Sequence, residues 1–218
     1  MGDLPFIMAT INGENMMMPA IFSLGYAGRK MEEVYAIAER YGIEYFLDVR
    51  SVPFSFRHPD YDKDALQVAL RARDIKYAYL GGVLGGMTIG GPNANANRPI
   101  SYDEFVEKEG VKVTLKRLIA LSEVSNVCLL CAEKNPTHCH RFRLIGRRLS
   151  SLGVEVGHIV SRGCVAQRDI EAFLRKKYGV DNDLFMSAEE GQNRIYSPDV
   201  LRGDATPWLA ELSVEPKR

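Results

Sequence analysis

The residue types best suited to chemistry are concentrated between Cys131 and Arg141, in the segment CAEKNPTHCHR. A proline after Asn135 should end a strand here, and a helix is predicted to follow, with Cys139 and His140 in its first turn. Free backbone N–H groups and the helix dipole at that position favour negative charge and lower the pKa of a thiol. We therefore predict that Glu133, Cys139 and His140 are catalytic and that Arg141 binds an anionic ligand.

Three interpretations of this segment remain open. In the first, Cys139 is a nucleophilic or redox thiol with a histidine nearby. In the second, Cys131 and Cys139 bind a metal together with His138 or His140, and the predicted set is Cys131, Cys139 and His138, although C-x7-C-H matches no standard zinc knuckle. In the third, the thiols are buried packing groups, and His140 and Glu133 hydrogen-bond the loop.

A second polar cluster follows an apolar run that ends at Val49. Asp48 and Arg50 are two residues apart at the end of this predicted strand, so their side chains share one face. A guanidinium there offers a planar fork to a carboxylate or phosphate, whereas the structural alternative is a salt bridge that ties down the strand end. We predict that Asp48 is catalytic and that Arg50 binds the ligand.

A glycine-rich segment over residues 81–99 is predicted to form a long loop of the kind that often closes over a site. It contains neither G-x-G-x-x-G nor G-K-[ST], so it supports no dinucleotide or P-loop site. The glycines still permit close approach of backbone to a ligand. The residues that complete the predicted ligand-binding set are Tyr26, Ser55, Arg57, Gly85 and Gly86.

The elements that must position these groups alternate along the chain. The predicted strands are residues 20–25, 45–49, 76–80, 127–132 and 154–160. The predicted helices are residues 31–41, 62–70, 101–121, 137–152 and 169–178. This alternation predicts an α/β fold: a doubly wound, mostly parallel five-stranded sheet with helices on both faces. Such sheets bind ligands beyond the carboxyl ends of their strands, where both polar clusters fall.

The chain of 218 residues is long enough for one domain with appendages. We expect an N-terminal extension over residues 1–19, the α/β domain over residues 20–178, and a C-terminal extension over residues 179–218 that is packed on the domain or partly irregular. Lys+Arg and Asp+Glu both number 28, so nucleic-acid binding would require a local basic patch, such as the faces carrying Arg143 with Arg147.

The four cysteines do not have the spacing of a disulfide framework, because three of them lie between residues 128 and 139. Cys128 and Cys131 are three apart in one predicted strand, so they point to opposite faces and cannot pair. No apolar run approaches the length of a membrane span, and the first twenty residues do not resemble a signal peptide. These features predict reduced thiols, a cytoplasmic location and no membrane partner.

Four motifs together resemble the domain of unknown function 488 family. They are Asp48-Val49-Arg50-Ser51-x-Pro53-x-Ser55, Pro59-x-Tyr61, Leu80-Gly81-x-x-Leu84-Gly85-Gly86 and Cys131-Ala132-Glu133-x-x-Pro136-x-x-Cys139-His140-Arg141. The resemblance runs from about residue 20 to residue 160, and it implies a small cytoplasmic α/β domain without an assigned reaction. The chain departs from the family at Phe56, where members often carry a basic residue, and at Ala27, where they often carry Ser.

The function predicted from these patterns is an enzyme that binds a small anionic, phosphate-bearing ligand at the carboxyl edge of the sheet. One alternative is a nucleic-acid-binding or repair-associated module that uses the basic helix faces. The other is a metal-dependent site at Cys131, Cys139 and a histidine. The sequence specifies neither the reaction nor a cofactor.

Overall fold

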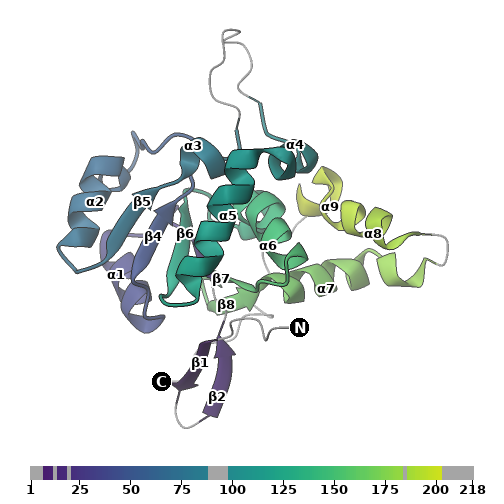
Figure 1. The fold of residues 1–218 in the computed structure, drawn as a ribbon, viewed down its shortest axis with the longest axis horizontal. Coiled ribbons are helices and arrows are strands. Elements are labelled where there is room, and N and C mark those ends of the chain that lie inside the picture. The colour runs from purple at the N-terminus through teal and green to yellow at the C-terminus, as the bar shows by residue number, and fades with distance from the viewer. Residues whose placement is uncertain (1–6, 12–13, 19–20, 88–97, 184–185, 203–218) are drawn as a thin grey trace.

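The computed structural model describes residues 7–11, 14–18, 21–87, 98–183 and 186–202. Its central feature is a sheet with the strand order β5-β4-β6-β3-β7-β8 (Figure 1). The strands are β3 (Ile21–Gly25), β4 (Tyr45–Asp48), β5 (Lys76–Tyr79), β6 (Val127–Cys131), β7 (Val156–Val160) and β8 (Gly163–Ala166). All neighbours pair in parallel except β7 and β8, so the predicted α/β class with a mostly parallel sheet is confirmed.

The predicted number of five strands differs from the structure, in which this sheet has six. The additional strand is β8, which folds back on β7 as an antiparallel edge strand after a tight turn. Gly163 begins it with φ of +145°, a conformation that residues other than glycine rarely adopt. The four residues of β8 are too few for hydrophobic alternation to distinguish a strand from a loop.

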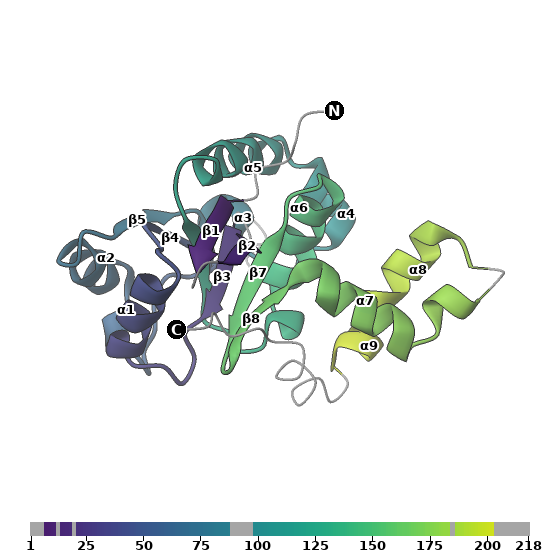
Figure 2. The same ribbon diagram turned by 90° about the horizontal axis from the view of Figure 1, so that it is seen from below.

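Helices cover both faces of the sheet, as predicted (Figures 1 and 2). One face packs against α1 (Met31–Arg40) and α2 (Lys63–Arg71). The other packs against α3 (Gly81–Leu84), α4 (Tyr102–Glu107), α5 (Glu109–Ser122) and α6 (Arg147–Ser151). Every residue of β3 and β6 is buried, as expected for central strands covered on both sides. Cys128 and Cys131 accordingly belong to different hydrophobic clusters, which confirms that they face opposite ways.

The helix predicted over residues 101–121 is divided in the structure. The capping box of Ser101 and Glu104 is present at the start of α4. Lys108 then adopts an extended conformation with ψ of +121°, and α5 begins after it. The short helical turns of the chain are η1 (Pro59–Tyr61), η2 (Pro136–His138), η3 (Arg141–Gly146, π-helical) and η4 (Val180–Asn182).

Both terminal regions contain regular structure. β1 (Ile7–Ile11) and β2 (Glu14–Met18) form an antiparallel hairpin within the predicted N-terminal extension. In the C-terminal extension, expected to be packed on the domain or partly irregular, α8 (Ala188–Ile195) and α9 (Pro198–Arg202) follow α7 (Gln167–Lys177), and the three helices share a hydrophobic cluster with Phe142. Residues 203–218 of this extension lie outside the described part of the chain. Among the described helices, none is long and apolar enough to cross a membrane.

A buried polar chain connects β3, β7 and α7 beneath this cluster. The hydroxyl of Ser23 lies 2.6 Å from Nδ1 of His158, and Nε2 of His158 lies 2.7 Å from Oε1 of Gln167. A glutamine oxygen only accepts, so Nε2 carries the proton and Nδ1 accepts from Ser23. His158 is fully buried, and burial lowers its pKa to about 4. The imidazole is therefore neutral in the folded protein at neutral pH.

This lowered pKa predicts a pH-dependent stability. Above the ordinary histidine pKa of 6.5 neither the folded nor the unfolded state protonates His158, and as the pH falls towards 4 only the unfolded state gains the proton. The free energy of unfolding should therefore lose about 2 kcal/mol from this group between about pH 7.5 and pH 5. Urea denaturation of the wild type and of His158→Gln at both pH values measures the difference. Equal losses in the two proteins would contradict the assignment.

Candidate functional site

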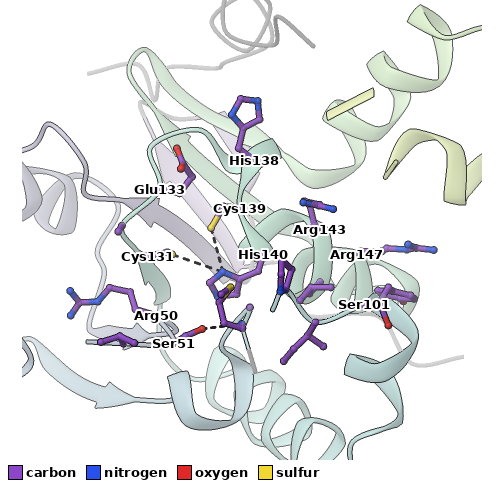
Figure 3. Close-up of a pocket in the computed structure, with 18 of the residues that line it drawn as sticks. Arg50, Ser51, Ser101, Cys131, Glu133, His138, Cys139, His140, Arg143 and Arg147 are labelled. Atoms are coloured by element: carbon purple, nitrogen blue, oxygen red, sulfur yellow. Dashed lines mark hydrogen bonds between the residues drawn. The ribbon is translucent and has the colours of Figure 1, made fainter. Parts of the chain in front are cut away.

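A cavity of about 760 Å³ lies at the carboxyl edge of the sheet, where the sequence predicted a site (Figure 3). Its walls are formed by residues 50–54 after β4, residues 131–133 after β6 and parts of residues 138–147. The two predicted polar clusters therefore converge. A direct contact joins them, because Nε2 of His140 lies 2.8 Å from the carbonyl oxygen of Val49.

The first wall is organised by Asp48, which is fully buried. Its carboxylate accepts hydrogen bonds from Nε of Arg50 at 2.9 Å and from the hydroxyl of Tyr77 at 2.7 Å. A second nitrogen of Arg50 lies 2.5 Å from the same carboxylate, and a third donates to the hydroxyl of Tyr26 at 3.2 Å. Burial opposes the charge of Arg50, but the hydrogen bonds and attraction of Asp48 outweigh it and raise the arginine pKa.

These contacts indicate different roles for Asp48 and Arg50. Arg50 lines the cavity, whereas Asp48 does not, and the carboxylate of Asp48 is already engaged by two neighbours. Asp48 therefore holds Arg50 in place, and this geometry does not favour the catalytic role predicted for it. Tyr26 also lines the cavity and stacks on Tyr61, with ring centroids 4.0 Å apart.

The second wall is organised by Arg141, which is 1% exposed. Its guanidinium donates to the carbonyl oxygen of Glu133 at 2.6 Å, to the hydroxyl of Ser23 at 3.3 Å and to the sulfur of Cys139 at 3.2 Å. The Glu133 carbonyl group lies so close to the backbone of β3 that position 25 requires a glycine, because a Cβ there would lie 1.9 Å from the Glu133 oxygen. The sequence predicted that Arg141 binds the ligand. In the structure Arg141 does not line the cavity, and its contacts hold the loop after β6 instead.

The sequence predicted that Cys139 lies in the first turn of a helix. In the structure Cys139 lies in a break between η2 and η3. Its backbone is extended, with φ of −108° and ψ of +147°, and its carbonyl oxygen accepts from the N–H groups of Phe142 and Arg143. Cys139 therefore caps the helical segment that begins at His140 and lies next to its first-turn N–H groups, rather than inside the first turn. The break exists because Asn135 and Pro136 start a separate turn, in which the Asn135 side chain accepts from the N–H of Thr137.

Other groups near Cys139 stabilise its thiolate. Burial opposes ionisation, but a hydrogen bond from Cys131 and the positive charge of Arg141 hold the pKa of Cys139 well below its usual value. The same hydrogen bond, together with burial, raises the pKa of Cys131 well above its usual value. Of the two sulfur atoms, that of Cys139 is therefore the one whose ionised form the surroundings favour.

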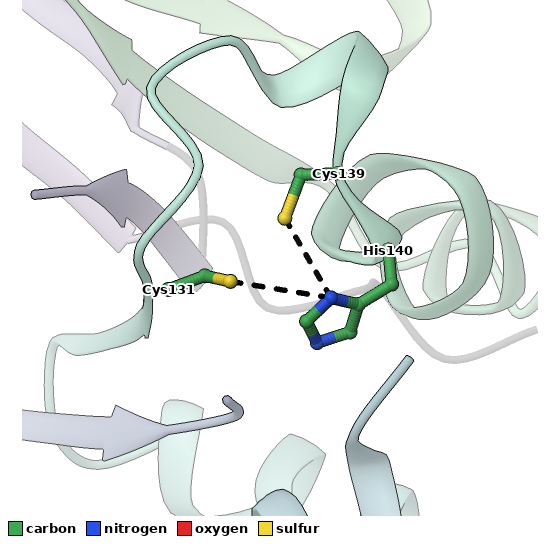
Figure 4. Close-up of side chains that lie close together, drawn as sticks. All are labelled: Cys131, Cys139 and His140. Carbon is green, nitrogen blue, oxygen red and sulfur yellow. Dashed lines mark hydrogen bonds between the residues drawn. The ribbon is translucent and has the colours of Figure 1, made fainter. Parts of the chain in front are cut away.

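His140 faces both sulfur atoms (Figure 4). Its Nδ1 lies 3.6 Å from Sγ of Cys139 and 4.0 Å from Sγ of Cys131. Nε2 donates to the carbonyl oxygen of Val49, so Nδ1 is the ring nitrogen that faces the two sulfur atoms. Among the described residues, these three form the group able to hold a metal ion, and His138, which was predicted as the third ligand, does not join them. His138 lines the cavity but points away from the sulfur atoms (Figure 3).

Of the remaining residues predicted for the site, some line the cavity and others do not. Glu133 and Gly86 line the cavity. Gly85 packs beneath it, where a Cβ would lie 2.7 Å from the hydroxyl of Ser51. Ser55 and Arg57 do not line the cavity: the N–H of Ser55 donates to Asp62, and Arg57 is exposed on the following turn. The lid predicted over residues 81–99 begins as α3, and its residues 88–97 lie outside the described part of the chain.

The predicted site omitted several residues that line the cavity. Arg143 and Arg147 reach it from consecutive turns, a spacing visible in the sequence but assigned there to a basic helix face. The guanidinium carbon of Arg147 lies 3.7 Å from the ring centroid of Tyr102 and 4.7 Å from that of Tyr196. Tyr196 belongs to the C-terminal region, and no local pattern in the sequence could associate it with the cavity.

Comparison with known proteins identifies one family. The family described as "Domain of unknown function DUF488" matches residues 30–147, which include both walls of the cavity. The resemblance predicted from the four motifs is thereby confirmed. Neither the curated proteins nor the solved structures include a match.

The contacts of Arg141 predict a large effect on stability. Arg141→Met would leave the Glu133 carbonyl oxygen and the Cys139 thiolate buried without their cationic partner. The free energy of unfolding should fall by about 3–5 kcal/mol, the usual range for a buried charge deprived of its partner. Arg148→Met, at a half-buried position in α6, should cost less than about 1 kcal/mol. Urea denaturation of both variants provides the comparison, and equal costs would contradict the structural role.

Proposed function

The chain belongs to the family described as domain of unknown function DUF488, and we propose that it is an enzyme binding an anionic, phosphate-bearing ligand in this cavity. The observation that carries the proposal is the charge of the lining. Arg143 and Arg147 line the cavity together with Arg50, whose charge Asp48 offsets, whereas Glu133 is the carboxylate among the described lining residues. Guanidinium groups bind phosphate through paired N–H donors, so this lining favours an anion.

The rigidity of the arginines supports the same conclusion. Arg147 is held between the rings of Tyr102 and Tyr196, and it donates to the neutral side chain of Asn193 at 2.6 Å. Arg50 is oriented by Asp48. A cation whose orientation is fixed before binding loses less entropy when a ligand arrives. Such preorganised charges also stabilise charge that develops during a reaction.

The reacting groups in this proposal are the polar side chains on the opposite wall. Cys139 and His140 face the cavity from the turn after β6, and Glu133 lies beside them. A cysteine whose ionised form is favoured by Arg141 is suited to act as a nucleophile, and the imidazole hydrogen-bonded to it and a nearby carboxylate can transfer protons. We propose Glu133, Cys139 and His140 as the catalytic group. All four cysteines are free thiols, which supports the cytoplasmic location that forms part of the proposal.

The nucleic-acid alternative gains no support from the basic residues of α7. Arg168 pairs with Glu155 at 3.1 Å, and Arg175 pairs with Asp181 at 2.6 Å. Since carboxylates offset these charges, the helix does not offer the unbroken basic face that binding a polyanion requires. We therefore do not propose this function.

Anion binding can be tested with a charge-matched pair of variants. Inorganic phosphate and a nucleoside monophosphate should raise the melting temperature of the wild type, because binding to the folded state alone stabilises it. The double variant Arg143→Gln/Arg147→Gln should bind at least about tenfold more weakly, since it loses two charged hydrogen-bond donors. The control Arg117→Gln/Arg148→Gln loses the same charge outside the cavity and should bind as the wild type does.

Two results would overturn this proposal. One is that neither phosphate compound raises the melting temperature of the wild type at millimolar concentration. The other is that both double variants respond equally, because the response would then reflect net charge rather than the cavity.

A further inference from the structure

We propose that Cys131, Cys139 and His140 bind a single zinc ion and leave its fourth coordination position open to the cavity. All three residues line the cavity wall, and their donor atoms lie within 4.8 Å of one another. Zinc binding by these three residues does not depend on whether the arginines of the cavity bind an anion. The role of the ion as the reaction centre rests on the proposed anion binding, and with zinc bound Cys139 and His140 serve as its ligands in place of the free reacting groups of that proposal.

The spacing of the donor atoms fits a tetrahedral ion. Bonds of about 2.3 Å to sulfur and about 2.0 Å to nitrogen place the sulfur and nitrogen atoms of a tetrahedron about 3.5 Å apart. The observed separations from Nδ1 of His140 are 3.6 Å to Cys139 and 4.0 Å to Cys131. Each sulfur-to-nitrogen separation therefore has to shorten by no more than about half an ångström for zinc to be coordinated, and the two sulfur atoms lie within 4.8 Å of each other.

The groups behind the donors have the arrangement expected around a metal ligand. A histidine that binds a metal through one nitrogen usually donates the other N–H to a carbonyl or carboxylate, which fixes the ring. Nε2 of His140 makes this contact with the Val49 oxygen, so Nδ1 is the nitrogen that faces the two sulfur atoms. Arg141 donates to the sulfur of Cys139 from the buried side, which stabilises a thiolate ligand without occupying the position towards the cavity.

The donor set selects the class of metal. Two sulfur atoms and one imidazole nitrogen suit zinc, whereas magnesium and calcium prefer oxygen ligands. Structural zinc sites are closed by four protein ligands, while catalytic sites have three and keep a position for water or substrate. Three protein ligands on a cavity wall correspond to the second class. An anion held by Arg143 and Arg147 would lie in the same cavity as that open position.

Gly86 provides a means of moving the histidine without removing a ligand. A Cβ on Gly86 would lie 2.7 Å from Cβ and Cγ of His140 and 3.0 Å from Nδ1, so alanine must displace the ring. A Cβ on Gly82 would meet nothing within 4 Å. Gly86→Ala and Gly82→Ala are therefore a matched pair, and the proposal predicts that only Gly86→Ala weakens metal binding, by roughly ten- to a hundredfold.

The experiment uses the full chain, purified without a histidine tag, stripped with chelator under reducing conditions and titrated with Co²⁺ and then Zn²⁺. The wild type should bind one equivalent of Co²⁺, with thiolate-to-cobalt charge-transfer absorption and the visible bands of a tetrahedral ion, and Zn²⁺ should remove both signals. Cys131→Ser, Cys139→Ser and His140→Gln should weaken binding by at least about a hundredfold. Cys164→Ser and His138→Gln, which alter residues outside the cluster, should bind as the wild type does.

The metal proposal is overturned if the reduced wild type shows no charge-transfer band. It is also overturned if His138→Gln, rather than His140→Gln, abolishes that band, or if Gly86→Ala and Gly82→Ala bind Co²⁺ equally well. Thermal shifts with inorganic phosphate on the same samples distinguish the two proposals. Cobalt binding without a phosphate response removes only the proposed function, and a phosphate response of the stripped protein without cobalt binding removes only the metal site.

Discussion

The buried guanidinium of Arg141 is the interaction on which the rest of the site depends. It joins the carbonyl oxygen of Glu133, the hydroxyl of Ser23 and the sulfur of Cys139, which belong to the loop after β6, to β3 and to the break before η3. A charge removed from water is tolerated only when its donors have partners, so the partners are fixed together with the arginine. This contact helps to hold Cys139 in place and, with the hydrogen bond from Cys131, lowers the pKa of its thiol, and His140 is the next residue in the chain.

Parallel pairing brings the wall organised by Asp48 to the same edge of the sheet. β4 and β6 are neighbours, so the residues after each strand emerge at one edge of the sheet. The hydrogen bond from His140 to the Val49 carbonyl oxygen joins the segments that follow β4 and β6, and the buried carboxylate of Asp48 orients Arg50. The cavity is consequently bordered by side chains whose orientations are set before any ligand arrives, which is the condition under which charged groups act most strongly on a bound anion.

The location of the site could be predicted from the sequence because it depends on strand order and on the ends of apolar runs. The sequence could not predict that His140, rather than His138, lies beside the two cysteines, because this depends on the break at Cys139 that separates η2 from η3. Nor could the sequence distinguish a carboxylate engaged on every side, as in Asp48, from a reactive one. The contact of Tyr196 with Arg147 arises from tertiary packing of the C-terminal helices, which leaves no local signal.

The central claim is that the arginines and the Cys131–Cys139–His140 wall border one anion-binding reaction centre. A crystal structure of the protein with inorganic phosphate tests it most directly. We expect a tetrahedral anion within hydrogen-bond distance of the guanidinium groups of Arg143 and Arg147, on the side of the cavity that faces Cys139 and His140. Phosphate bound only elsewhere on the surface, with the cavity filled by water, would contradict the claim.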